Sequence, residues 1–168
     1  MTLGWNLERY IELLKKFRNY DYLKYTEPDP ELSEFAFHGN CIQAYFEYKD
    51  CQRYSTILHS FLANEIDIER LTKKFILLRR KHYDLTEKTI EKIEKYIDLS
   101  LPFEELDLQI EWNLEIQMLH DKIEYLYQML GSKVYYFDYK CNYKNEFSVR
   151  TYVWIMISQH ISIFKKLS

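Results

Sequence analysis

The chain has 168 residues and a net charge of −3 at pH 7, from 23 Lys and Arg against 26 Asp and Glu. This near balance argues against a protein that grips nucleic acid without regard to sequence, because such proteins are normally strongly basic. Hydrophobic residues make up 47% of the chain and favour a packed core, whereas only 3 Gly and 3 Pro disfavour a Rossmann fold, a P-loop enzyme or a turn-rich β-sandwich.

Apolar residues recur at helical spacing along most of the chain. The segment Glu27-Pro28-Asp29-Pro30 is expected to end the first helix, and a short helical turn is expected before Gly39. Asp67 and Thr86 are suitable N-caps for the third and fourth long helices. The predicted helices span about 6–20, 41–62, 68–82, 87–98, 109–130 and from about 146 onward.

Two patterns overlap between residues 106 and 130. Apolar and polar residues alternate from Leu106 to Ile116, which is strand periodicity. From Trp112 to Leu130, however, apolar residues step by four and three, and Gly131 follows as a helix stop. The longer pattern predicts a helix from about Gln109, and residues 103–108 are left unassigned.

The last part of the chain also offers two readings. Strand formers are dense over 133–139, and residues 143–146 could turn a short β-hairpin near 133–147. A helical stripe from Val149 to Leu167 instead favours a closing helix from about Glu146. The sequence therefore predicts an all-α, antiparallel bundle of about five or six helices in a single domain over 1–168, with the hairpin as an alternative.

The sequence gives no sign of a membrane segment, a metal site or a cofactor. No apolar run reaches the roughly 18 residues of a membrane span, and the first residues lack a signal-peptide layout, so a cytoplasmic protein is expected. Cys41, Cys51 and Cys141 form no CxxC pair, and with His38 and His59 they match no zinc spacing, so unligated thiols are expected. No cofactor is predicted.

Charge is segregated along the chain. Residues 70–82 carry six bases and no acid, whereas residues 85–130 carry eleven acids against four bases. Such a region favours a docking surface for a basic partner. The alternative is that these charges form only the solvent-exposed face of an amphipathic helix. The predicted partner-binding carboxylates are Glu87, Glu91, Glu94, Asp98, Glu104, Glu105, Asp107 and Glu111.

A pattern between Ile57 and Phe75 combines a helix end, a short turn, a capping residue and a new helix. The residues that carry it are Phe61-Leu62, Asn64-Glu65-Ile66, Asp67, Leu71 and Phe75. Over about residues 55–100 the chain resembles the colicin D type of bacteriocin immunity proteins. The glycine of that family's turn is Ala63 or Asn64 here.

The resemblance implies a non-catalytic helical bundle that binds and blocks a nuclease toxin domain, a tRNA-cleaving one in the namesake. Acidic side chains would then occupy the cationic cleft that holds the phosphates of the substrate. The implied partner is a basic protein toxin, with no direct contact to nucleic acid. The oligomeric state stays open, and no single contact residue can be carried over from the family.

Two other functions compete with this one. Arg53 and His59 have a spacing that resembles the Arg-x4–6-His element of HEPN-class helical ribonucleases, whose pair acts on the scissile phosphate. Alternatively, 16 Tyr, 10 Phe and 3 Trp suit a structural or assembly subunit with an aromatic interface. Of the other histidines, His120 is interpreted as half of a surface pair with Asp121, and His160 as a packed side chain.

Overall fold

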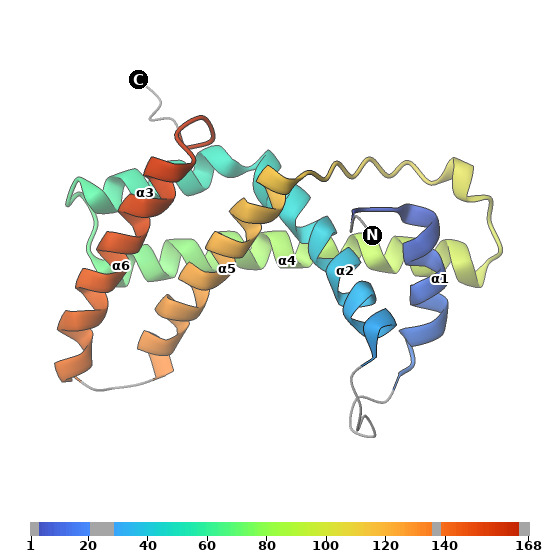
Figure 1. Ribbon diagram of the computed structural model, residues 1–168, viewed down its shortest axis with the longest axis horizontal. Coiled ribbons are helices and arrows are strands. Elements are labelled where there is room, and N and C mark those ends of the chain that lie inside the picture. The colour runs from blue at the N-terminus through green and yellow to red at the C-terminus, as the bar shows by residue number, and fades with distance from the viewer. Residues whose placement is uncertain (1–3, 21–28, 136–138, 165–168) are drawn as a thin grey trace. The chain divides into compact units, whose positions relative to one another are not determined.

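The computed structural model describes residues 4–20, 29–135 and 139–164, with side chains left out over 132–145 (Figure 1). These residues contain six α-helices, one short 3-10 helix and no strand. The expected all-α fold class is therefore confirmed. The helices are α1 (Leu7–Phe17), α2 (Pro30–Lys49), α3 (Cys51–Leu62), α4 (Ile68–Asp98), α5 (Leu114–Tyr135) and α6 (Tyr139–Gln159), with the 3-10 helix η2 (Phe103–Glu105) between α4 and α5.

The chain divides into two compact units. Unit 1 comprises Met1–Phe46 and Tyr83–Gln117, and unit 2 comprises Glu47–His82 and Met118–Ser168. The boundaries fall inside α2, α4 and α5 rather than in linkers. That residues 1–168 behave as one domain stays a prediction.

The core of unit 1 forms around α1. Asn6 caps this helix, since its Oδ1 accepts a hydrogen bond from the Arg9 N–H at 2.9 Å. The inward face of α1 packs with Ile42 of α2, Ile93 of α4 and a segment that follows η2. The fully enclosed members of this core are Tyr10, Ile11, Leu14, Ile42, Ile93 and Leu106.

The core of unit 2 is built by α3, the first half of α4, α5 and α6. Large aromatic side chains lie at its centre, and Tyr54 meets Phe75 edge to face with ring centroids 5.5 Å apart. His160 is buried here against the ring of Phe164, so its interpretation as a packed histidine is confirmed.

The turn between α3 and α4 follows its sequence signals. Asn64 adopts the left-handed conformation with φ 60, and the N–H groups of Asn64 and Glu65 bond back to the carbonyls of Phe61 and Ser60. This is a Schellman ending, in which a residue just past the helix takes positive φ. Asp67 then caps α4, because its Oδ1 accepts from the Arg70 N–H at 2.8 Å.

The prediction of a helix over 41–62 is wrong at both its start and its middle. Helix α2 begins at Pro30 and runs through Gly39, because proline suits the first turn of a helix and one internal glycine is tolerated. The chain then breaks at Asp50. The carboxylate of Asp50 bonds to Lys81 and His82 of α4, contacts that periodicity along the chain does not reveal.

The predicted break between 82 and 87 is also wrong, because α4 is one helix of 31 residues. Thr86, the expected cap, is buried inside it. No proline or glycine occurs between His82 and Glu87, so the chain has no strong reason to leave the helix there. Cap-forming residue types thus start helices only where the backbone before them is already non-helical.

Residues 106–113 have no regular secondary structure and follow an extended path (Figure 1), with a tight turn at Asp107 where the Leu108 N–H donates to the Leu106 carbonyl at 2.8 Å. The prediction of helix from Gln109 is therefore wrong up to Asn113. Within this extended segment Leu106, Leu108 and Ile110 turn inward, whereas alternate polar residues are exposed. The strand-like alternation was the correct pattern here. Helix α5 begins only after Asn113, whose Oδ1 accepts from the Ile116 N–H at 2.9 Å.

The expected stop at Gly131 is wrong, since α5 continues to Tyr135. The hairpin alternative near 133–147 is likewise not seen, because the described residues of that range are helical. Helix α6 begins at Tyr139 rather than near Glu146. Residues 136–138, which fall inside the suggested hairpin, lie outside the described residues.

Substitutions at Asn64 test the left-handed turn. Asn64→Ala is expected to lower the free energy of unfolding by about 1 kcal/mol, because a Cβ-bearing residue without a polar side chain tolerates positive φ poorly. Asn64→Gly is expected to be neutral or slightly stabilising. Urea unfolding measures both changes.

Asn40→Ala is the matched control, since Asn40 is exposed inside α2, where alanine is the better helix former. Equal destabilisation by Asn64→Ala and Asn40→Ala would contradict the positive φ at residue 64.

Candidate functional site

Four of the eight predicted site carboxylates form a stripe on α4, called here the α4 stripe. The stripe comprises Glu87, Glu91, Glu94 and Asp98, at intervals of four, three and four residues. At 3.6 residues per turn these intervals place all four on one side of the helix. Three are exposed and Glu94 is half-buried.

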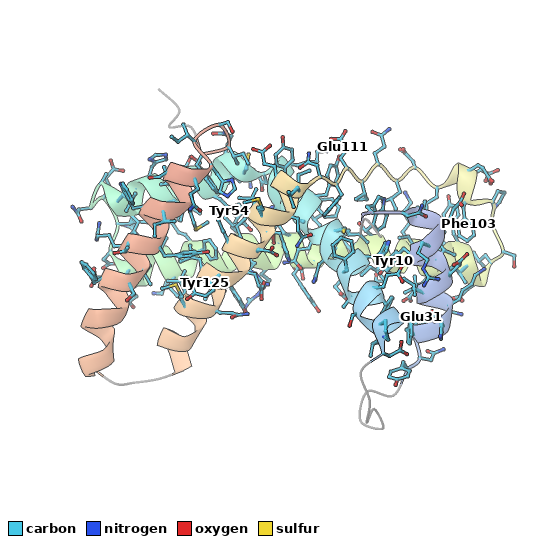
Figure 2. All side chains as sticks on the ribbon, in the orientation of Figure 1. Tyr10, Glu31, Tyr54, Phe103, Glu111 and Tyr125 are labelled. Atoms are coloured by element: carbon cyan, nitrogen blue, oxygen red, sulfur yellow. The ribbon has the colours of Figure 1, made fainter. Side chains whose placement is uncertain are left out.

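The other four carboxylates lie on η2 and on the extended segment. Glu104 and Glu105 belong to η2, and Asp107 and Glu111 follow on the extended segment, where Figure 2 labels Glu111. All four are exposed, because Leu106, Leu108 and Ile110 take the inward positions between them. Packing of these apolar side chains thus directs the neighbouring carboxylates toward solvent.

These two groups do not form one continuous face. The Lys92 ammonium donates to the Asp107 carbonyl at 3.4 Å, and the Tyr96 hydroxyl donates to the Glu105 carbonyl at 3.3 Å. The extended segment therefore runs along the side of α4 that carries Lys92 and Tyr96. Tyr96 projects about 170° around the helix axis from the α4 stripe. The eight predicted residues thus form two acidic surfaces rather than one.

The two groups of carboxylates also differ in the ion pairs that they form within the protein. Asp98 is bound by Arg18 at 2.6 Å, so one carboxylate of the α4 stripe is satisfied within unit 1. In the part of the chain that the structure describes, none of the other seven carboxylates has a cation within 4 Å. The carboxylates of η2 and the extended segment are therefore all available to a partner.

The backbone of the extended segment is also available for hydrogen bonding. Over 4–20, 29–135 and 139–164, no acceptor takes a hydrogen bond from the backbone N–H groups of residues 109–112. Exposed backbone groups in an extended chain bond to water and can pair with another strand. This segment thus offers both carboxylates and backbone donors to a partner.

The Arg53 and His59 pair does not converge on one site. Arg53 is exposed and pairs with Asp50 at 3.3 Å, whereas His59 bonds through Nε2 to the Phe164 carbonyl at 2.8 Å. Six residues apart on α3, the two side chains lie about 120° apart around the axis. A carbonyl accepts hydrogen bonds, so His59 Nε2 donates to Phe164 and is already engaged within the protein. The HEPN-like geometry gains no support here.

Buried polar pairs in unit 2 were missed by the sequence reasoning. His120, interpreted above as a surface residue, is 5% exposed, and its Nδ1 lies 2.9 Å from the carboxylate of the fully buried Glu47. Burial lowers the pKa of His120, but the hydrogen bond and charge of Glu47 outweigh it, so the pKa is raised overall. The pair joins α2 to α5 inside the core, and its imidazole holds a proton more strongly than a free histidine does.

A second network of side-chain hydrogen bonds links Tyr54, His82 and Asp50. The Tyr54 hydroxyl lies 2.7 Å from His82 Nδ1, and His82 Nε2 lies 3.0 Å from Asp50 Oδ2. Burial lowers the pKa of His82 more than Asp50 raises it, which favours neutral imidazole donating to Asp50 and accepting from Tyr54. Because Tyr54 is fully buried, no substrate can reach its hydroxyl, and this hydrogen-bond network has a structural role.

The described cysteines and histidines do not converge on a metal. Cys41 is buried, which raises the pKa of its thiol to about 12, and burial also raises the pKa of Cys51. In the part of the chain with described side chains, no three His, Cys, Asp or Glu residues could hold an ion together. Cys141 lies outside the residues whose side chains are described.

No protein-family model, no curated protein and no solved structure matches this chain. Among the described residues, no helix is long and apolar enough to cross a membrane.

The Glu47–His120 pair predicts a pH-dependent stability. Because the pKa of His120 is raised in the folded chain, the stabilisation is complete below about pH 6.5 and is lost as the pH rises through the raised pKa. Glu47→Gln is therefore expected to cost about 1.5–3 kcal/mol at pH 6 and less at pH 9, measured by urea unfolding.

Glu115→Gln, on the exposed side of α5, is the control and should change stability little at either pH. A loss from Glu47→Gln that is the same at pH 6 and pH 9 would show that His120 is not charged in the folded state.

Proposed function

We propose that the chain is an immunity protein that binds a cationic nuclease toxin and blocks its substrate cleft. One observation carries the proposal: η2 and the extended segment hold four exposed carboxylates outward, and among the described residues none of the four has a cation within 4 Å of its carboxylate. A nuclease cleft must be cationic to hold phosphates, so carboxylates fixed on a packed backbone suit it.

Several features support this assignment of the binding surface. The inward leucines anchor the extended segment on the unit 1 core, so the carboxylates need little ordering when a partner arrives. The N–H groups of residues 109–112, which have no acceptor among the described residues, add a means of pairing with an edge strand of the partner. The α4 stripe, with Asp98 already paired and Glu94 half-buried, has the lesser role of steering a cationic partner by its field.

The resemblance to colicin D-type immunity proteins supports the same class of function. Of the residues that carry the resemblance, Asn64 ends α3 and Asp67 caps α4. The apolar residues Leu71 and Phe75 lie in the unit 2 core. The extended segment lies beyond the resemblance, so the binding residues are this chain's own feature. A tRNA-cleaving toxin is the partner class that the resemblance favours.

Charge reversal separates direct contact from steering. The partner for this test is the protein encoded in the reading frame beside the coding sequence, purified and titrated against the chain. Reversing the η2 and extended-segment carboxylates to Lys is expected to weaken binding by about 2–5 kcal/mol, mainly through faster dissociation. Reversing the α4 stripe is expected mainly to slow association and to reduce the salt dependence.

The same partner tests the function in cells. Induction of the neighbouring reading frame should arrest growth and cleave RNA, and co-expression of this chain should restore growth. The η2 and extended-segment reversal should abolish this rescue, while Glu115→Gln, an exposed carboxylate on α5, should retain it. A neighbour that is harmless, or rescue that survives the reversal, contradicts the proposal.

A specific observation also favours the assembly-subunit alternative. Phe147 is 72% exposed and Trp154 is 62% exposed on α6, and such side chains are enriched at interface centres. Gel filtration discriminates the two functions, because an obligate subunit would not persist as a stable monomer on its own.

A further inference from the structure

A groove of about 620 Å³ opens between α3 and the first half of α4, within unit 2. Its apolar floor comes from Ile57 of α3 and from Leu77 and Leu78 of α4. Leu77 is 63% exposed in the middle of α4. The floor is therefore an apolar surface that the described chain leaves uncovered.

The rim of this groove is cationic. Arg53, Lys74 and Lys81 line it, and no carboxylate does. Asp50 lies at one end, where it pairs with Arg53 at 3.3 Å and with Lys81 at 3.2 Å. Lys74 has no carboxylate within 4 Å among the described residues, so a positive charge remains beside Leu77.

The spacing along α4 extends the same surface. Arg70, Lys74, Leu77 and Lys81 are separated by four, three and four residues, which places them on one side of the helix. Arg70 is exposed, so the cationic stripe continues by one turn beyond the groove. The apolar residue thus lies in the middle of a row of cations.

We propose that this groove binds an amphipathic helix of a partner protein, with the helix's apolar side on Leu77 and its flanking Asp and Glu residues beside Lys74, Arg53 and Lys81. A helix about 10 Å across fills a volume of this size over one to two turns, and apolar anchors at i, i+3 and i+4 suit a groove between two helices. Gln52 and Thr56 also line the groove, but no aromatic ring does, so nucleic acid fits less well because its bases would have no ring to stack on.

The proposal goes beyond the proposed immunity function and does not depend on it. The carboxylates of η2 and the extended segment belong to unit 1, whereas the groove lies in unit 2 and has the opposite charge. A cationic toxin would be repelled by the groove, so its occupant is a different, acidic partner. The two proposals therefore fail independently.

Fluorescence anisotropy with labelled peptides tests the groove. The probe is a 15-residue helical peptide with a leucine stripe and flanking Glu residues, and its counterpart carries Lys at every Glu position. The chain is expected to bind the Glu peptide at micromolar concentrations and the Lys peptide at least about tenfold more weakly. Leu77→Ser and Lys74→Glu, both exposed positions, should each weaken binding of the Glu peptide about tenfold or more.

Matched controls come from unit 1. Leu99→Ser removes another exposed leucine and Lys88→Glu reverses another exposed lysine of α4, and neither should change the affinity by more than about twofold. Equal binding of the two peptides, no binding of the Glu peptide at 1 mM, or indifference to Leu77→Ser and Lys74→Glu would overturn the proposal. Binding of phosphatidylglycerol vesicles without binding of the Glu peptide would also overturn it, in favour of a lipid surface.

Discussion

The account of unit 1 depends on one physical constraint, the alternation of side chains along an extended backbone. Because Leu106, Leu108 and Ile110 pack inward, Asp107 and Glu111 must face solvent. A shift of one residue would bury the acids and expose the leucines, so burial of the apolar side fixes the register. The same packing leaves the backbone donors of residues 109–112 without partners in the described chain.

Unit 2 is organised by buried polar contacts of a different kind. Glu47 and His120 form a hydrogen-bonded pair inside the core. At the junction of α2 and α3, Asp50 contacts His82, Lys81 and Arg53. Breaking either set leaves an uncompensated buried group, which costs more than the intact contact contributes. The Asp50 contacts hold the start of α3 beside α4, and the cationic groove lies between these two helices.

Some local signals in the sequence predicted local structure, whereas the expected cap at Thr86 and stop at Gly131 lie inside helices. The cap at Asp67, the turn at Asn64 and the start of α1 depend on neighbouring residues alone, and each was placed correctly. The division at Asp50 was missed because its cause is a contact with His82, 32 residues away. Glu47 and His120 are 73 residues apart, so no spacing rule could pair them. The acidic composition was visible, but its separation into two surfaces depends on Lys92 and Tyr96 holding the backbone of residues 105–107.

Hydrogen exchange of the extended segment tests the central claim most directly. In the free chain, peptides covering 104–113 should exchange rapidly at residues 109–112, because no acceptor among the described residues binds those N–H groups. On binding the protein encoded beside the chain, those peptides should become protected, while peptides from α6 keep their free-state rates. Protection elsewhere, with unchanged exchange over 104–113 in a saturated complex, would contradict the assignment of this segment as the contact surface.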